Sequence, residues 1–166
     1  MDAQYYISNL NLQPHPEGGY FKETYKAAES IPAEALPTRF NGDRSFSTAI
    51  YYLLQQGDYS AFHRINSDEC WHFYAGQTLL IHTLENDGKY SCTKLGADIN
   101  AGEAFQFVVP ATAWFASEPA PGSTFCLAGC TVAPGFDFND FEMADRKNLL
   151  AAYPQHSEII NRLTRQ

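Results

Sequence analysis

Residues 57–76 read Gly57-Asp-Tyr-Ser-Ala-Phe-His63-Arg-Ile-Asn-Ser-Asp-Glu69-Cys-Trp-His72-Phe-Tyr-Ala-Gly76. Two strand-like runs, 59–65 and 70–75, flank a turn whose Asn, Ser and Asp side chains can hydrogen bond to their own backbone. Side chains alternate between the two faces of a strand. If the runs are neighbouring antiparallel strands, they place His63 and Glu69 close together among aromatic side chains.

The pairing of His63 with Glu69 points to acid–base chemistry. Burial raises the pKa of a carboxylic acid and lowers that of a histidine, which moves both towards neutrality. Such a pair can remove and return a proton beside a carbonyl group. We predict that His63 is the base and that Glu69 either orients it or acts as the acid. The simpler alternative is that both are solvated side chains near a turn.

Other residues are expected to surround a ligand. Aromatic side chains would form the walls of its pocket, and a guanidinium at the end of the irregular segment 26–43 could hold an anionic group. Glu23 is either a charge at a sheet edge or a polar group that lines the interior. The predicted ligand-binding residues are Glu23, Arg44, Trp71, Phe73, Gln106 and Trp114.

A short loop, His15-Pro-Glu17-Gly-Gly19, precedes the first long strand. Its two glycines allow positive φ or a close approach of the backbone. His15 and Glu17 could therefore reach a ligand, although a rigid turn is the simpler reading of the same residues.

Turn signals separate nine or ten short strand-like runs between residues 20 and 133, which is typical of a β-sandwich or barrel. A short helix is expected within residues 1–12. After residue 138 the pattern becomes helical, with Asn139 or Asp140 as an N-cap and a second helix after Pro154. We predict an all-β fold with minor α content, in a single domain over residues 1–166.

Charge and composition narrow the function. The net charge of −8 argues against binding to nucleic acid or to anionic membranes. Neither a signal peptide nor an apolar run of about 20 residues is recognisable, so a cytoplasmic location is expected.

Cys126 and Cys130 would lie about 13 Å apart on one strand, beyond the ~7 Å that a disulfide allows. The four cysteines are predicted to be reduced, buried thiols.

The spacing of Gly57, His63, Glu69 and Gly76 resembles the first motif of the cupin superfamily. Ile65 stands where that motif has a second histidine. Gly102 and Pro110 suggest the second motif, in which Thr112 replaces a glycine and Phe115 a histidine. Three further segments, 15–21, 47–54 and 130–138, are similar to the small single-domain cupin-5 type, a branch of unassigned activity.

The resemblance implies a cupin jelly roll, the double-stranded β-helix, with its barrel over about 18–135 and C-terminal helices over about 139–165. It also implies a homodimer and a small-molecule ligand. Because two of four metal ligands are missing, no cofactor is favoured. A distant similarity to sugar-nucleotide epimerase-like cupins points to a metal-independent isomerase or epimerase, acting on a sugar-nucleotide-like or other small polar substrate.

Two alternatives stay open. One is a ligand-binding cupin without catalysis. The other is a metal-dependent oxygenase or isomerase, in which His63, Glu69 and His72 would hold a divalent transition metal.

Overall fold

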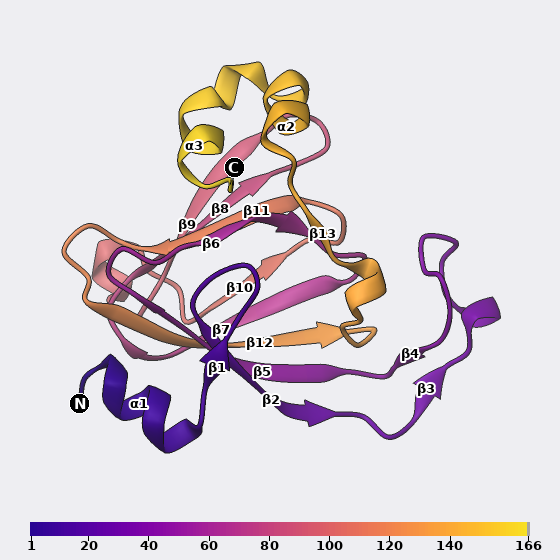
Figure 1. The fold of residues 1–166 in the computed structure, drawn as a ribbon, viewed down its shortest axis with the longest axis horizontal. Helices are drawn as coiled ribbons and strands as arrows, with labels where there is room; N and C mark the ends of the chain where they lie inside the picture. Colours follow the sequence, from indigo (N-terminus) through magenta and orange to yellow (C-terminus); the bar gives the residue numbers. More distant parts are fainter. Residues whose placement is uncertain (166) are drawn as a thin grey trace.

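A computed structural model of the chain describes residues 1–165. The fold is mostly β, with helices at the C-terminal end, and its two main sheets face each other as in a jelly roll (Figure 1). The sheets do not close into a continuous barrel. The prediction of a β fold with C-terminal helices is confirmed.

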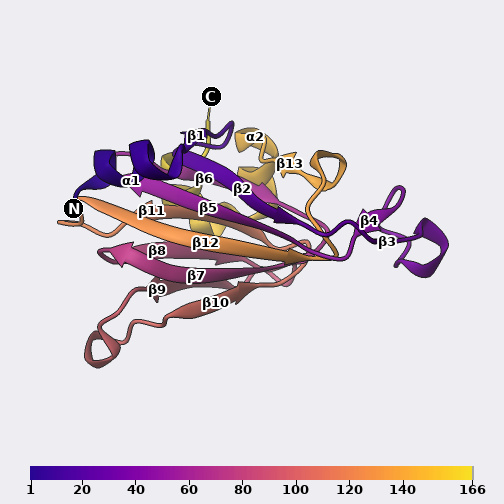
Figure 2. The ribbon, with the colours of Figure 1, turned by 90° about the horizontal axis from the view of Figure 1, so that it is seen from below.

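Six strands form the first sheet, and Figure 2 shows its strands running side by side. Their order across the sheet is β1 (Gln13–Pro14), β2 (Tyr20–Lys26), β5 (Thr48–Gln55), β12 (Phe125–Ala133), β7 (Asp68–Gly76) and β10 (Gln106–Val109).

The second sheet has five strands. Their order is β13 (Glu142–Met143), β6 (Ser60–Arg64), β11 (Trp114–Pro119), β8 (Leu79–Leu84) and β9 (Tyr90–Leu95). A small separate ladder pairs β3 (Ser30–Ile31) with β4 (Arg44–Ser45).

The helices are short. The α-helices are α1 (Ala3–Leu10), α2 (Arg146–Ala152) and α3 (Ser157–Arg162). Single 3₁₀ turns are η1 (Ala33–Ala35), η2 (Ile99–Ala101), η3 (Phe138–Asp140) and η4 (Pro154–His156). Among the described residues, none of these helices is long and apolar enough to cross a membrane.

Strand alternation separates the apolar side chains into an inner core and two outer layers. Between the sheets, Tyr52 of β5, Trp71 of β7 and Phe115 of β11 are buried in one cluster. Helix α1 covers the outer face of the six-stranded sheet, where Leu53 is buried. Helices α2 and α3 cover the outer face of the five-stranded sheet (Figure 1), where Phe62 is buried.

Two local predictions were wrong. Strands β6 and β7 are not hydrogen-bonded neighbours, because each belongs to a different sheet. The first C-terminal helix is capped by Asp145, whose side chain accepts from the Asn148 N–H, and not by Asn139 or Asp140. The segment that was expected to be helical instead forms η3 and then β13, which pairs with β6.

Candidate functional site

A cavity of about 80 Å³ lies between the two sheets at one end of the jelly roll. Its polar lining comes from both sheets and from the loop before β2, and Phe21, Phe136 and Phe138 supply aromatic walls. The polar and ionisable lining residues are His15, Glu17, Glu23, Thr48, His63, Glu69 and Cys130. Among the described residues, the lining contains neither lysine nor arginine.

Tight loop geometry brings Glu17 into this cavity. The loop is closed by hydrogen bonds from His15 N to Gly19 O and from Gly18 N to His15 O, both 3.0 Å. Gly18 has a φ of +120°, and a Cβ there would lie 2.1 Å from the Tyr59 carbonyl oxygen, so only glycine fits. The Ala61 N–H donates to the Glu17 carbonyl at 3.1 Å. The loop is therefore fixed against β6, and the Glu17 side chain is buried.

Glu17 and His63 share one proton. The Nε2 atom of His63 lies 3.1 Å from Glu17 Oε2. On the other side of the ring, Nδ1 lies 2.7 Å from the Ala61 carbonyl oxygen, which can only accept, so Nδ1 carries a proton. The contact between Nε2 and Oε2 then needs one further proton. An imidazolium that donates to the Glu17 carboxylate satisfies both contacts of the ring.

His15 is held as a neutral imidazole. The Glu17 N–H donates to His15 Nδ1 at 3.2 Å, so the ring proton lies on Nε2. Burial lowers the pKa of His15, against the opposing effect of the Glu17 carboxylate. The 3.6 Å contact between Nδ1 and Glu17 Oε1 is consequently not an ion pair.

Glu69 reaches the cavity from β7, in the sheet opposite His63. Burial, reinforced by the negative charge of Glu17, raises the pKa of Glu69 to about 8, although a hydrogen bond with Cys130 opposes this rise. At neutral pH Glu69 is therefore mainly a protonated, uncharged acid. The cavity thus combines a neutral carboxylic acid on one wall with a proton-sharing pair on the other.

The structure brings together five of the residues singled out from the sequence. His63, Glu69 and Glu23 line the cavity, and so do His15 and Glu17 of the loop before β2. The partner of His63 differs from the expected one, because Glu17 and not Glu69 is the carboxyl group in contact with its ring.

The aromatic residues predicted from the sequence, Trp71, Phe73 and Trp114, lie outside the cavity lining, as does Gln106. Trp71 is buried deeper between the sheets against Tyr52, and Phe73 packs at the margin of the same cluster. Trp114 faces the opposite side of its sheet, below the guanidinium of Arg64. Gln106 is exposed and contacts His72.

Arg44 also lies outside the lining, in a buried ion pair. Its Nε and Nη2 atoms donate to the two carboxylate oxygens of Asp140, each at 2.6 Å. Its Nη1 atom donates to the carbonyl oxygen of Asp43 at 2.7 Å. The hydrogen bonds to Asp140 raise the pKa of Arg44. Arg44 therefore anchors the segment around η3, which carries Phe136 and Phe138 to the cavity.

The donor set does not fit a metal ion. His72 alternates to the outer face of β7, where its ring contacts Gln106 Nε2 at 2.9 Å and Thr131 Oγ1 at 3.1 Å. It cannot join His63 and Glu69, so the metal-ligand set considered from the sequence does not assemble. Among residues 1–165, no three His, Cys, Asp or Glu side chains are arranged to hold a metal ion.

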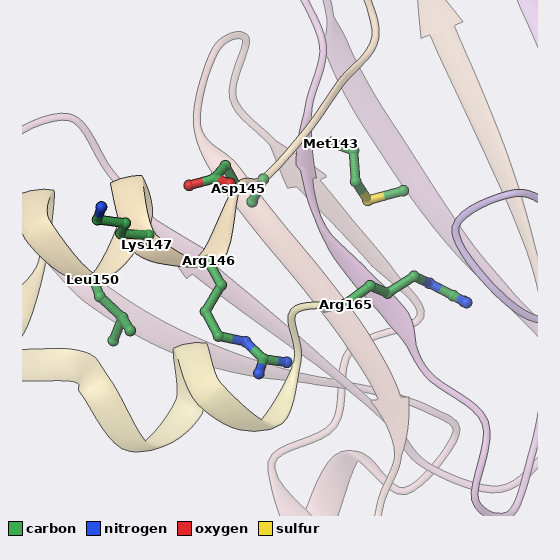
Figure 3. Close-up of a pocket in the computed structure, with 7 residues that line it drawn as sticks. Met143, Asp145, Arg146, Lys147, Leu150 and Arg165 are labelled. Carbon is green, nitrogen blue, oxygen red and sulfur yellow. The ribbon is translucent and has the colours of Figure 1, made fainter.

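A wider hollow on the surface has a different character. It has a volume of about 520 Å³ and lies beside α2, with Arg146, Lys147 and Arg165 around it (Figure 3). Two of these cations are bound to their own chain, because Arg146 donates to Thr164 and Arg165 donates to the Glu17 carbonyl. The hollow lacks the convergent acid and base groups of the smaller cavity.

Comparison with known proteins gives consistent matches over most of the chain. A family model described as "Cupin superfamily (DUF985)" matches residues 4–144. An uncharacterised Saccharomyces cerevisiae protein, YML079W, is 35% identical over 149 residues, which cover 82% of this chain and 72% of the yeast protein.

Solved structures extend the comparison to the fold. A hypothetical protein from Leishmania major has 33% identity and a TM-score of 0.90, with 100% of both chains covered. Protein SO0799 from Shewanella oneidensis has 38% identity and a TM-score of 0.89, covering 99% of this chain and 98% of its own. Oxalate decarboxylase from Bacillus subtilis has 14% identity and a TM-score of 0.55, over 90% of this chain and 36% of its own, a likeness of fold alone.

Proposed function

The chain belongs to the cupin superfamily, in the family DUF985, and on that premise we propose that it is a metal-independent acid–base enzyme of the isomerase or epimerase type. Its reaction is the removal and return of a proton on a carbon beside a carbonyl group. One observation carries the proposal: His63 Nε2 lies 3.1 Å from Glu17 Oε2, while His63 Nδ1 donates its proton to the Ala61 carbonyl.

The two walls of the cavity would divide the chemistry between them. The Glu17 carboxylate, held by the His63 ring, accepts the proton that leaves the substrate carbon, which makes the His63–Glu17 pair cationic. Glu69, as a neutral acid, donates a hydrogen bond to the carbonyl oxygen as that oxygen becomes an enolate. Return of the proton by the pair to the neighbouring carbon gives an isomer, and delivery of a proton by Glu69 to the opposite face of the same carbon gives an epimer.

Size and charge favour the smaller of the two substrate classes considered. A sugar nucleotide carries a pyrophosphate, which proteins commonly hold with arginine or lysine. The described cavity lining contains neither residue, and its volume is about 80 Å³. These features support a small, polar and uncharged hydroxycarbonyl compound in preference to a sugar nucleotide.

Proton exchange with solvent tests the proposal. The protein is incubated in D₂O with a panel of small hydroxyaldehydes and hydroxyketones and one 4-keto sugar nucleotide, and deuterium incorporation is followed by mass spectrometry. We expect exchange on a small substrate to fall at least about 100-fold in His63→Ala and in Glu17→Gln, because general base catalysis contributes that much. His72→Ala, on the outer face of β7, is the matched control and should retain exchange.

Other outcomes separate the alternatives. Exchange that persists in both His63→Ala and Glu17→Gln would refute the role of the pair. If compounds raise the melting temperature saturably but none exchanges, the protein is a ligand-binding cupin without catalysis.

The resemblance further implies a homodimer in the cytoplasm, and both remain proposals. Strand β10 lies at one edge of the six-stranded sheet, and Val108 on it and Phe105 just before it are exposed. We propose this apolar edge as the surface through which two copies of the chain would pair their edge strands.

A further inference from the structure

A second cluster of ionisable side chains lies on the outer face of the five-stranded sheet, beside the C-terminal helices. It contains His82 from β8, Tyr90 and Cys92 from β9, and Glu118 from β11. Arg162 of α3 approaches from the helical layer. None of these residues lines the cavity between the sheets.

The cluster is built around His82, whose side chain is 3% exposed. The register of β8 and β9 places Cys92 directly opposite His82, so both side chains lie on the same face. His82 Nε2 lies 3.1 Å from Glu118 Oε1, and Nδ1 lies 2.8 Å from the Tyr90 hydroxyl. Arg162 also donates to Glu118. The ring is thereby oriented by a carboxylate, as in nucleophile–histidine–carboxylate sites.

Cys92 differs from the other cysteines in its surroundings. It is exposed, whereas Cys126 and Cys130 are buried, so the prediction that all four thiols are buried was wrong. The adjacent His82 lowers the pKa of the Cys92 thiol, against the opposing effects of burial and of the Glu118 carboxylate, whereas burial raises the pKa of Cys126 to about 12.

The histidine complements this thiol. Burial alone would lower the pKa of His82, but its contacts with Cys92 and Glu118 outweigh burial and raise it. The residues that face the pair are Tyr90 from β9, Glu118 from β11 and Arg162 from α3, with His156 of η4 beyond the Tyr90 ring. His82 and Tyr90 favour the thiolate form of Cys92, which the Glu118 carboxylate opposes, and Cys92 and Glu118 favour the imidazolium form of His82.

We infer that Cys92 is a redox modification site, a nucleophilic thiolate activated by His82 and Glu118 that reacts with hydroperoxides. The Cys92 sulfur attacks the terminal peroxide oxygen, so that an S–O bond forms and the O–O bond breaks. The departing hydroxide or alkoxide takes its proton from the His82 imidazolium. Sulfur is oxidised to a sulfenic acid, and the peroxide is reduced to water or an alcohol.

Exposure of the thiol and the adjacent proton donor favour this chemistry. A peroxide reaction needs an accessible thiolate and a proton for the leaving oxygen, and the cluster supplies both. An acyl transfer would instead develop an oxyanion, which a neighbouring Glu118 carboxylate would repel. A hollow of about 450 Å³, bordered by Tyr90, His156 and Arg162, adjoins the cluster.

The test compares individual cysteines in the intact chain. Hydrogen peroxide is added with dimedone to trap sulfenic acid, and iodoacetamide alkylation is followed from pH 6 to pH 9.5, each by peptide mass spectrometry. At pH 7 we expect Cys92 to react at least about tenfold faster than Cys70, because burial raises the pKa of the Cys70 thiol. In His82→Gln the Cys92 rate should fall about tenfold at pH 7 and recover at pH 9.5.

Glu118→Gln is a second variant that keeps the size of the side chain, and it should slow Cys92 at pH 7 without changing Cys70. Circular dichroism identifies any variant that has lost its fold. The inference is overturned if Cys92 reacts no faster than Cys70 in the unmodified chain. It is equally overturned if both folded variants keep the original Cys92 rate across the pH range.

Discussion

Between pH 4.5 and pH 8 the free energy of unfolding of the unmodified protein should fall by about 4 kcal/mol through Glu69 alone, and replacing Glu69 by glutamine should abolish this fall. The folded protein holds the Glu69 proton up to a pKa of about 8, against an ordinary value of 4.5. Over this interval the unfolded chain releases the proton while the folded chain keeps it. The free energy of unfolding therefore falls as the pH rises, and glutamine, which does not titrate, abolishes that contribution.

Urea unfolding at several pH values measures this effect as the difference between the two proteins. We expect similar stabilities at pH 4.5 and a more stable Glu69→Gln variant at pH 8. Glu34→Gln is the matched control, because Glu34 is exposed on a surface turn and should leave the pH profile unchanged. Parallel profiles for Glu69→Gln and the unmodified protein would show that Glu69 is not a buried acid.

Arg44→Met is the second substitution with a large expected effect. Arg44 and Asp140 form a bidentate pair with almost no solvent exposure. Removing the arginine leaves the Asp140 carboxylate buried and, among residues 1–165, with only the Asn66 amide, 3.0 Å away, as a side-chain donor. Breaking such a pair costs about 3–5 kcal/mol. Denaturant unfolding should show a loss of this size.

Two further variants give this measurement its specificity. Glu142→Gln removes the exposed partner of Arg64, and an exposed pair should cost less than about 1 kcal/mol. The double replacement Arg44→Met with Asp140→Met should recover much of the loss, because no unpaired charge remains buried. A loss in Arg44→Met as small as that in Glu142→Gln would contradict the anchoring role of Arg44.

Local sequence patterns, mainly the alternation of side chains along short runs, predicted the strands and the location of the candidate site. The alternation around His63 and Glu69 correctly pointed both side chains to the interior. Their relation was not predictable from the turn at 66–68, because that turn joins two different sheets instead of two strands of one hairpin. The residues consequently face each other across the cavity.

Glu17 shows why the remainder of the site was harder to find. The loop that carries it suggested a ligand contact, but its pairing with His63 depends on the close approach of Gly18 to Tyr59, some 40 residues away in the chain. The two glycines after Glu17 were the local signal of that approach. Likewise, Asp140 and Asp145 are both of a residue type that favours N-caps, but Asp145 caps α2 whereas Asp140 pairs with the distant Arg44.

The central claim is that a neutral Glu69 faces the His63–Glu17 pair across one small cavity. A ¹³C NMR titration of the glutamate side-chain carboxyl groups, with Glu69 assigned through Glu69→Gln, tests it most directly. The account predicts a pKa of about 8 for Glu69 and a lower pKa for Glu69 in Glu17→Gln, where the neighbouring charge is gone. A pKa near the ordinary value of 4.5 in the unmodified protein, with no response to Glu17→Gln, would contradict it.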